Sequence, residues 1–246
     1  MMTVGELSPE GWLEPQRILV ILAHPDDPEF FCGAAIARWT AAGHEVRYGL
    51  LTHGDKGVKD QPADPQALIA LREAEQRAAA AILGVHSIRY LDFADGYLVP
   101  DLEARRQVVR LIRQERPQVV VSCDPTNVFV HDTYINHPDH RAAGQLVMDA
   151  VFPAAGNPMF FPELLAEGLQ PWSAREVWFS LTAQPNVRLD VTAYWEQRLR
   201  ALHEHRSQVG ADLAAFDERQ RSAHTEDSTP DAPRYEHGFR RVVFRQ

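Results

Sequence analysis

Stretches that favour strands and stretches that favour helices alternate four times along the first part of the chain. Strands are predicted at 17–24, 45–52, 87–93 and 118–123, and the first and last are continuous apolar runs, typical of buried strands. Helices are predicted at 29–42, from Pro65 to Gly84, from Asp101 to about Glu115, and from about Pro138 to Val151. Such alternation is typical of a parallel sheet with helices on both faces. The sequence therefore predicts an α/β fold with a Rossmann-like, mostly parallel sheet.

The C-terminal part of the chain has a less regular pattern. We expect 152–172 to be a loop or lid that walls the pocket, with a short helical turn near Glu163. Strands are predicted at 176–183 and 186–192, a helix at 193–208, and a strand or ordered arm at 239–246, whereas 210–235 is weakly patterned. We interpret 1–246 as a single α/β domain in which 17–151 forms the core that carries the site.

Polar side chains gather where the predicted strands end. His24, His53, Asp124, and Asp92 or Asp95 lie at or just after these ends. In open parallel sheets, ligands bind beyond the carboxyl ends of the strands. We therefore expect these side chains at one rim of the sheet, with His53 on a loop that can line a pocket.

Two clusters of histidine and aspartate dominate the candidate chemistry: His24-Pro25-Asp26-Asp27 and His137-Pro138-Asp139-His140. The residue before a proline avoids the α region, so a strand ends near His24 and a turn or helix follows. Residues three apart on such a turn project to the same side, which lets His24 and Asp27 contact one metal ion. His137 and His140 have the same spacing, and Pro138 suits the first position of a helix.

Two imidazoles and one carboxylate are a ligand set for zinc that leaves a position open for water, as in catalytic sites. The same ligand types also bind iron, cobalt and manganese. A metal ion lowers the pKa of water and polarises a carbonyl, and Asp26 beside the ligands is the best candidate for a general base. His137 is left to stabilise an oxyanion or to protonate a leaving amine. One His-Pro-Asp is more often a capped turn, but two such clusters at one rim are hard to explain by capping alone.

Composition narrows the functional classes. The 246-residue chain is 45% hydrophobic and 24% charged, which is ordinary for a globular protein. Its formal net charge of -9 argues against a nucleic-acid partner, because binding phosphates needs a basic face. The two cysteines, Cys32 and Cys123, are expected to be buried thiols rather than a disulfide framework. We see no signal-peptide pattern and no run of roughly 20 apolar residues, so we expect a cytoplasmic protein without membrane contact.

At these clusters the chain resembles the PIG-L/LmbE-like family of zinc-dependent de-N-acetylases. The resemblance rests on Ala-His-Pro-Asp-Asp at Ala23–Asp27 and on His-Pro-Asp-His at His137–His140, and 52–55, 71–85, 90–96 and 205–208 also fit the family layout. It implies hydrolysis of an N-acetyl sugar or glycoconjugate, usually a GlcNAc-type group, to free amine and acetate. It also implies one zinc ion per chain and a homo-oligomer, either a trimer or a hexamer.

The resemblance implies roles for individual residues by motif position. The implied zinc ligands are His24, Asp27 and His140. Asp26 is the implied general base, and His137 is the implied oxyanion stabiliser or acid, with Asp139 supporting it.

Three further residues are candidates for substrate binding. Arg72 matches an arginine that contacts substrate in some family members, although a solvated or salt-bridged helix residue is an equal alternative. Asp95 can support His137 or simply form the turn before Gly96. His53 completes this group because it lies on a rim loop.

The chain departs from the family pattern near the motifs. Pro28 stands between Asp27 and Glu29, Gly33-Ala34 replaces a frequent Gly-Gly pair, and Ile135, next to Tyr134, stands where some members have tyrosine. These differences touch the rim of the pocket and leave the ligands in place.

Other functions remain open at this level. The scissile bond can belong to another amide, in a thiol conjugate or an acylated natural product. A non-catalytic sugar- or nucleotide-binding module would not need Asp26 and His137, and the chain has no G-x-G-x-x-G after its first strand. A two-metal phosphoesterase would need more bridging carboxylates than the sequence offers.

Overall fold

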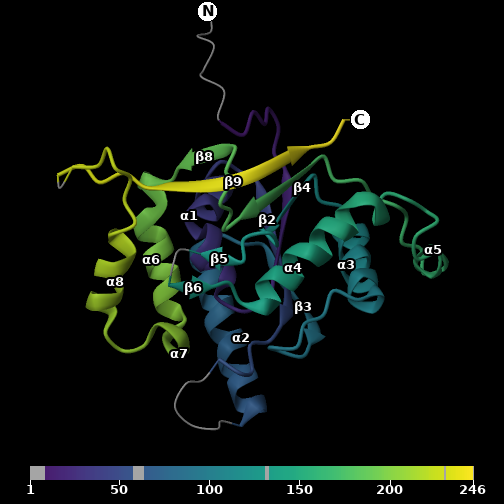
Figure 1. Ribbon diagram of the computed structural model, residues 1–246, viewed down its shortest axis with the longest axis horizontal. Helices are drawn as coiled ribbons and strands as arrows, with labels where there is room; N and C mark the ends of the chain where they lie inside the picture. The colour runs from purple at the N-terminus through teal and green to yellow at the C-terminus, as the bar shows by residue number, and fades with distance from the viewer. Residues whose placement is uncertain (1–8, 58–63, 131–132, 230, 246) are drawn as a thin grey trace, which may run out of the picture.

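The computed structural model describes residues 9–57, 64–130, 133–229 and 231–245. Seven strands form one sheet in the order β3-β2-β1-β4-β7-β9-β8. The first five in this order are parallel, and β9 pairs antiparallel with both β7 and β8. The strands are β1 Arg17–Leu22, β2 Glu45–Thr52, β3 Ser87–Phe93, β4 Val119–Cys123, β7 Glu176–Ser180, β8 Val187–Asp190 and β9 Glu236–Val243. The predicted α/β fold with a mostly parallel sheet is confirmed (Figure 1).

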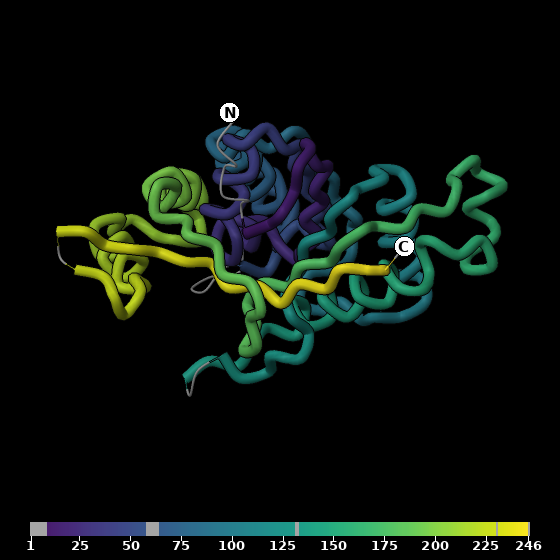
Figure 2. Tube along the Cα trace, turned by 90° about the horizontal axis from the view of Figure 1, so that it is seen from above, coloured from purple at the N-terminus to yellow at the C-terminus, as the bar shows by residue number. Residues whose placement is uncertain are grey.

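Helices cover both faces of this sheet (Figure 2). Successive side chains of β1 point to opposite faces, so Val20 packs on one side and Ile21 on the other. One face packs against α1 (Asp27–Ala41), α2 (Pro65–Ile82) and α6 (Trp195–Glu204), and the other against α3 (Leu102–Glu115) and α4 (Pro138–Asp149). Burial of both faces explains why β1 is a continuous apolar run rather than an alternating one.

Local signals in the sequence set where the helices lie. The side chain of Asp64 accepts a hydrogen bond from the N–H of Gln66 at the start of α2, and Asp101 caps α3 in the same way. In α4, a Cβ on Gly144 would collide with the carbonyl oxygen of Cys123. Glycine therefore lets α4 pack closely against the end of β4, which brings the start of α4 to the carboxyl end of the sheet.

The segment 152–172 lies elsewhere than expected. Its short helix is present as α5 (Glu163–Ala166) after a π-helical turn at Ala150–Ala154. The buried guanidinium of Arg113 in α3 donates hydrogen bonds to four main-chain oxygens of this region, those of Ala154, Ala155, Asn157 and Phe160. These contacts hold the segment against α3 at one end of the long axis, as Figure 1 shows. None of 152–172 is among the described residues that line the cavity over the two clusters, contrary to the expectation that this segment walls the pocket.

Other parts of the second half refine the predictions. The weakly patterned region 210–235 contains α8 (Leu213–Arg221), capped by Asp212 and anchored by buried Phe216. The predicted helix at 193–208 becomes a 3-10 turn at Thr192–Tyr194, then α6 and the short α7 (Arg206–Val209). A hairpin of β5 (Phe129–Val130) and β6 (Tyr134–Ile135) was not predicted, because strands of two residues are too short to show an alternation of apolar and polar side chains.

Two expectations from composition concern cysteines and membranes. Cys32 and Cys123 are both free and buried, as predicted. Within the described ranges, no helix is long and apolar enough to cross a bilayer. Residues 1–8, which bear on the expectation that no signal peptide is present, lie outside the described residues.

Candidate active site

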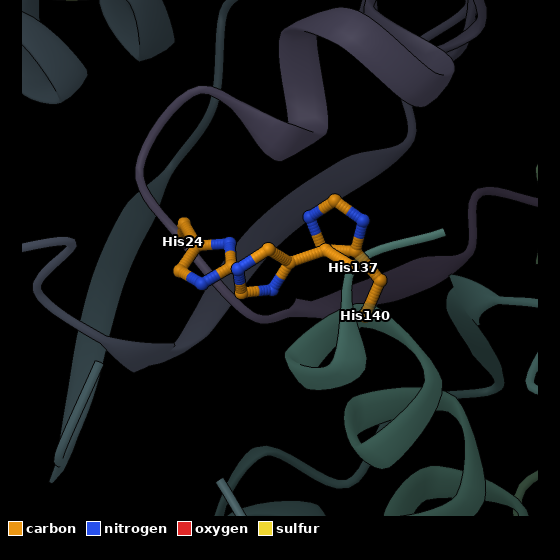
Figure 3. Close-up of side chains that lie close together, drawn as sticks. All are labelled: His24, His137 and His140. Atoms are coloured by element: carbon orange, nitrogen blue, oxygen red, sulfur yellow. The ribbon is translucent and has the colours of Figure 1, made fainter. Parts of the chain in front are cut away.

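The two His/Asp clusters meet at the carboxyl end of the sheet. His24 lies in the turn between β1 and α1, and His137 is the N-cap residue of α4. Figure 3 shows the rings of His24, His137 and His140 gathered at one place. The ring centre of His24 is 4.9 Å from that of His137 and 5.2 Å from that of His140. The rim predicted from the strand ends therefore brings together three imidazoles from segments far apart in sequence.

Asp27 joins the two clusters. Its Oδ2 lies 3.3 Å from Nδ1 of His24 and accepts the His24 N–H at 2.8 Å, while its Oδ1 lies 3.1 Å from Nε2 of His140. Burial raises the pKa of Asp27, but the charges and hydrogen bonds of His140 and His24 outweigh burial and lower the pKa overall. The structure thus holds an ionised carboxylate between two imidazoles.

The spacing of these atoms fits a metal ion. Ligands about 2.0–2.1 Å from a tetrahedral zinc ion lie roughly 3.3 Å from one another. The two contacts of Asp27, at 3.3 Å from Oδ2 to His24 and 3.1 Å from Oδ1 to His140, are close to this spacing but involve different oxygens of the carboxylate. Ligand atoms of His24, His137 and His140 also lie within 4.8 Å of one another, so His137 can approach the same centre. The three histidines could hold a divalent metal, and so could a second group of described residues, His24, Asp95 and Asp139; Asp27 is in neither group.

Asp26 lies beside this centre but has different partners. Its backbone has a φ of 87°, and its side chain is only 13% exposed. One carboxylate oxygen lies 3.3 Å from a guanidinium nitrogen of Arg72. Burial raises the pKa of Asp26 to about 6, the charge of Asp27 adds to the rise, and Arg72 opposes it. Asp26 is therefore a carboxylate that can gain and lose a proton near neutral pH.

Arg72 is buried rather than solvated. Its guanidinium donates to the carbonyl oxygens of Gly54 at 2.7 Å and Pro25 at 2.6 Å, in addition to its contact with Asp26. The alternatives to a substrate contact were a solvated arginine and a salt-bridged arginine, and the structure shows the salt bridge, with Asp26. Arg72 also lines the cavity, so a contact with substrate remains a prediction.

The Asp139 carboxylate contacts a different histidine from the one expected. Its Oδ2 lies 3.3 Å from Nε2 of His24, and its two oxygens accept the N–H groups of Gly96 and Leu98. His137 is contacted instead by the Asp139 peptide, whose N–H donates to Nδ1 of His137 at 3.2 Å. The difference arises because the loop after β3 offers two N–H donors that draw the carboxylate toward His24.

Asp95 also contacts His24 rather than His137. Its Oδ1 lies 3.1 Å from Nε2 of His24, and its Oδ2 accepts the N–H of Lys56 at 2.6 Å. Burial opposes ionisation of Asp95, but hydrogen bonds from His24 and Lys56 prevail and lower its pKa to about 2. Burial likewise lowers the pKa of His24, but the charge of Asp27 and bonds to Asp139 and Asp95 raise it well above its ordinary value. Nδ1 of His24 thus faces the carboxylate of Asp27, and Nε2 faces the carboxylates of Asp95 and Asp139.

His53 is not brought to the site. Its ring stacks on Tyr90 of β3 with a centroid distance of 4.6 Å. Its two nitrogens lie 2.8 Å from Glu73 and 2.7 Å from Asp92. These contacts turn the ring toward α2 and β3, and His53 is not among the described residues that line the cavity. The expected pocket position of His53 is therefore wrong.

A cavity of about 560 Å³ lies over the two clusters. Sequence reasoning did not assign several of its lining residues, which are Phe30, Phe31, Lys56, Gly57, Gly96, Tyr134 and Gln208. The signal for the two phenylalanines was present, because they occupy the first turns of the helix that Asp27 begins. A larger groove of about 640 Å³ runs along β3 and α3, but it contains none of the clustered histidines and aspartates.

The fold and the site together define an α/β protein with a histidine–carboxylate centre at the carboxyl end of a parallel sheet. The model of the PIG-L family, GlcNAc-PI de-N-acetylase, matches residues 19–151. The chain belongs to this family of deacetylases, as the two sequence motifs indicated.

Relatives and solved structures agree with this assignment. Diacetylchitobiose deacetylase of Thermococcus kodakarensis is 38% identical over 204 residues, which span 83% of this chain and 74% of the relative. The 1D-myo-inositol 2-acetamido-2-deoxy-alpha-D-glucopyranoside deacetylase of Streptomyces avermitilis is 32% identical over 198 residues, 70% of this chain and 64% of the relative. The structure of N,N'-diacetylchitobiose deacetylase from Pyrococcus horikoshii matches with a TM-score of 0.82 and 30% identity, over 92% of this chain and 84% of that chain.

Proposed function

We propose that the chain hydrolyses the acetamide of an N-acetylated sugar or glycoconjugate, with a zinc ion held by His24, Asp27 and His140. The observation that carries the proposal is the position of Asp27, which contacts both histidines while Asp26 stays beside them with its own partner. The relatives with similar sequence are deacetylases of N-acetylated amino sugars by name, which supports the same substrate class here.

Zinc bound at such a site polarises an amide carbonyl and lowers the pKa of water. In the proposed mechanism, Asp26 takes the proton of the attacking water. A pKa of about 6 supports this role, because the carboxylate is mostly ionised at neutral pH and is still basic enough to accept a proton. Arg72 would keep Asp26 ionised and oriented through their contact of 3.3 Å.

His137 is the proposed oxyanion stabiliser or acid. Burial lowers its pKa, and the neighbouring charges of His24 and His140 lower it further, which favours a neutral ring. Nδ1 of His137 accepts the N–H of Asp139, so the proton of the neutral ring belongs on Nε2. An N–H at Nε2 of the neutral ring can donate a hydrogen bond to a developing oxyanion, whereas protonation of the leaving amine would need the imidazolium form of His137 or the proton that Asp26 has taken from water.

The cavity supports a sugar-sized substrate. Its volume of about 560 Å³ falls within the usual range for small-molecule sites. Phe30, Phe31 and Tyr134 offer ring faces, and Lys56, Asp95 and Gln208 offer polar groups in the same cavity. Such a mixed lining suits a pyranose, which has apolar ring faces and hydroxyl edges.

The proposal is tested by metal content together with acetate release from a panel of N-acetylated amino sugars and other acetamides. We expect about one zinc ion per chain, as in single-metal sites of this kind. The variant Asp26→Asn should retain zinc and lose at least about 100-fold in kcat, the lower end of the usual contribution of a general base. Asp92→Asn, at an exposed rim position, is the matched control and should leave kcat unchanged.

Two outcomes would contradict the proposal. Bound zinc without acetate release from any sugar, but with hydrolysis of another amide, would replace the substrate class and keep the chemistry. A protein that binds no divalent metal after reconstitution would overturn the mechanism and favour the non-catalytic binding module.

A further inference from the structure

A buried carboxylate lies directly behind Asp26, outside the proposed metal centre. Glu29, in the first turn of α1, is 0% exposed. It accepts hydrogen bonds from the hydroxyl of Tyr48 at 3.0 Å and from the amide nitrogen of Gln76 at 3.1 Å, and lies 3.2 Å from Nε2 of His205. A buried carboxylate needs such partners, because removing it from water without them is strongly unfavourable.

The carboxylate of Glu29 fixes which way the amide of Gln76 points. Nε2 of Gln76 lies 3.1 Å from both oxygens of Glu29, so this end of the amide must be the donor. The other end is therefore the oxygen, and it accepts the backbone N–H of Asp26 at 2.8 Å. An amide turned the other way would place NH₂ against an N–H and a carbonyl oxygen against a carboxylate.

This hydrogen bond holds Asp26 in an unusual backbone conformation. With φ at 87° and ψ at -30°, Asp26 lies outside the common regions for a residue with a Cβ, which costs on the order of 1–3 kcal/mol. The conformation separates two successive carboxylates, since Asp27 turns to His24 and His140 while Asp26 turns to Arg72. The surrounding contacts must stabilise this arrangement.

A distant segment completes the support. His205 stands at the junction of α6 and α7 and is 0% exposed. Two residues later, the N–H and hydroxyl of Ser207 donate to the Glu75 carboxylate at 2.9 and 2.6 Å. Glu75 precedes Gln76 in α2, so the segment that carries His205 is tied to the same helix as Gln76.

We propose that Glu29 and Gln76 are positioning residues for Asp26, in which Glu29 orients the Gln76 amide and the amide oxygen holds the Asp26 N–H. His205 and Tyr48 support Glu29 in this role. The inference rests on the proposed function, in which Asp26 is the general base. It concerns the position of Asp26 and neither metal binding nor substrate contact.

The test compares single variants of Glu29 and Gln76 with the double variant in which the two side chains are exchanged. Gln76→Glu places two carboxylates together, and Glu29→Gln removes the charge that orients the amide. Each single variant should lower kcat by about 10- to 100-fold, the size expected when a catalytic group is misplaced by about 1 Å, with KM and zinc content near those of the wild type.

The double variant Glu29→Gln/Gln76→Glu restores one carboxylate and one amide to the pair. The carboxylate now at position 76 can accept the Asp26 N–H, and the amide now at position 29 can donate to that carboxylate. Both hydrogen bonds are again possible in the double variant. Its kcat should therefore be at least about tenfold higher than that of Gln76→Glu, a partial recovery of the activity lost through misplacement of Asp26.

Glu10→Gln is the matched control. Glu10 is also buried, at 3% exposed, and its carboxylate accepts hydrogen bonds from Arg38 and Trp39 away from the cavity. This variant should lose stability without a change in kcat. A double variant that is no better than Gln76→Glu, or a Glu10→Gln variant that loses as much kcat as Glu29→Gln, would overturn the inference.

Hydrogen exchange provides a readout that does not depend on activity. The Asp26 amide should exchange slowly in the wild type and faster in Gln76→Leu, which has no acceptor, whereas amides in the middle of β1 should stay protected. Gln76→Met offers a second variant without an acceptor if Gln76→Leu does not fold. Unchanged exchange at Asp26 would overturn the inference even if the protein proves to be a deacetylase. Faster exchange would support the positioning contact even if no acetamide is hydrolysed.

Discussion

Asp139 and His24 are 115 residues apart in sequence, yet a carboxylate oxygen of Asp139 lies 3.3 Å from Nε2 of His24. The cluster at the start of α4 therefore orients an imidazole of the cluster that follows β1. The same ring has Asp27 at Nδ1. If Nδ1 bound a metal ion, an N–H at Nε2 donating to Asp139 would leave the Nδ1 lone pair free for that ion. A carboxylate in this position would support His24 as the metal ligand that we propose it to be.

The first prediction concerns this support. In Asp139→Asn, the single amide oxygen can accept only one of the N–H groups of Gly96 and Leu98, which bond to different oxygens of the carboxylate, and the charge beside His24 is lost. We expect zinc affinity to fall by about 10- to 100-fold, as is usual when such a partner of a metal ligand is changed. Competition with a chelating dye measures the affinity. Asp149→Asn, at the other end of α4 where Asp149 pairs with Arg105, should leave zinc affinity unchanged. Equal affinities for Asp139→Asn and the wild type would contradict the prediction.

The second prediction concerns pH dependence. Burial raises the pKa of Asp26 to about 6 and Arg72 opposes the rise, so loss of the guanidinium raises the pKa further. A general base must be deprotonated, and activity falls as the pH drops through its pKa. In Arg72→Gln the acidic limb of kcat/KM should therefore move to higher pH, with a smaller move in Arg72→Lys, which keeps the charge. A limb that stays in place or moves to lower pH in Arg72→Gln would refute this role of Arg72.

The third prediction separates stability from activity at Arg113. Arg113 is 1% exposed and holds four carbonyl groups of 154–160. Arg113→Met should lower the free energy of unfolding by on the order of 2–4 kcal/mol, because several buried acceptors lose a charged donor. It should leave KM and kcat unchanged, because 152–172 does not line the cavity. Urea unfolding and steady-state kinetics measure the two effects, and a large rise in KM would show that 152–172 does form part of the pocket.

The fourth prediction concerns stability in acid. Burial of His237, with a smaller contribution from the Arg198 charge, lowers its pKa to about 3, whereas a histidine in the unfolded chain has a pKa of about 6.5. Between these values the unfolded state binds a proton that the folded state does not, so stability falls as the pH drops from about 6.5 toward 3. This contribution has a slope of at most about 1.4 kcal/mol per pH unit.

Replacement of His237 should therefore make the protein less sensitive to acid. We expect the free energy of unfolding of His237→Phe to fall less steeply over this pH range than that of the wild type. His86→Phe is the control, because the His86 side chain is 62% exposed and lacks the burial that acts on His237. Parallel pH profiles for His237→Phe and the wild type would count against the prediction.

The sequence determined the core of the fold and the chemistry of the two clusters. The buried strands could be predicted from the sequence because a strand with helices on both faces must be apolar at successive positions, as in β1. The sequence also predicted that His24 lies near Asp27 and that His137 lies near His140. Both spacings fall within a single turn, where local geometry decides which side chains project to the same side. The carboxyl ends of neighbouring parallel strands then bring the clusters to one rim.

Only the tertiary structure decided which groups pair across the site. The Asp139 carboxylate reaches His24 rather than His137, and His53 turns away to Tyr90. The contacts of Gln76 with Asp26 and with Glu29 span about 50 residues of sequence, and no local pattern encodes them. Such pairings depend on how whole helices pack, because each buried polar group must find a partner among the groups that the fold brings near it. Local periodicity specifies elements and turns, whereas these partners are specified by the packing of the complete chain.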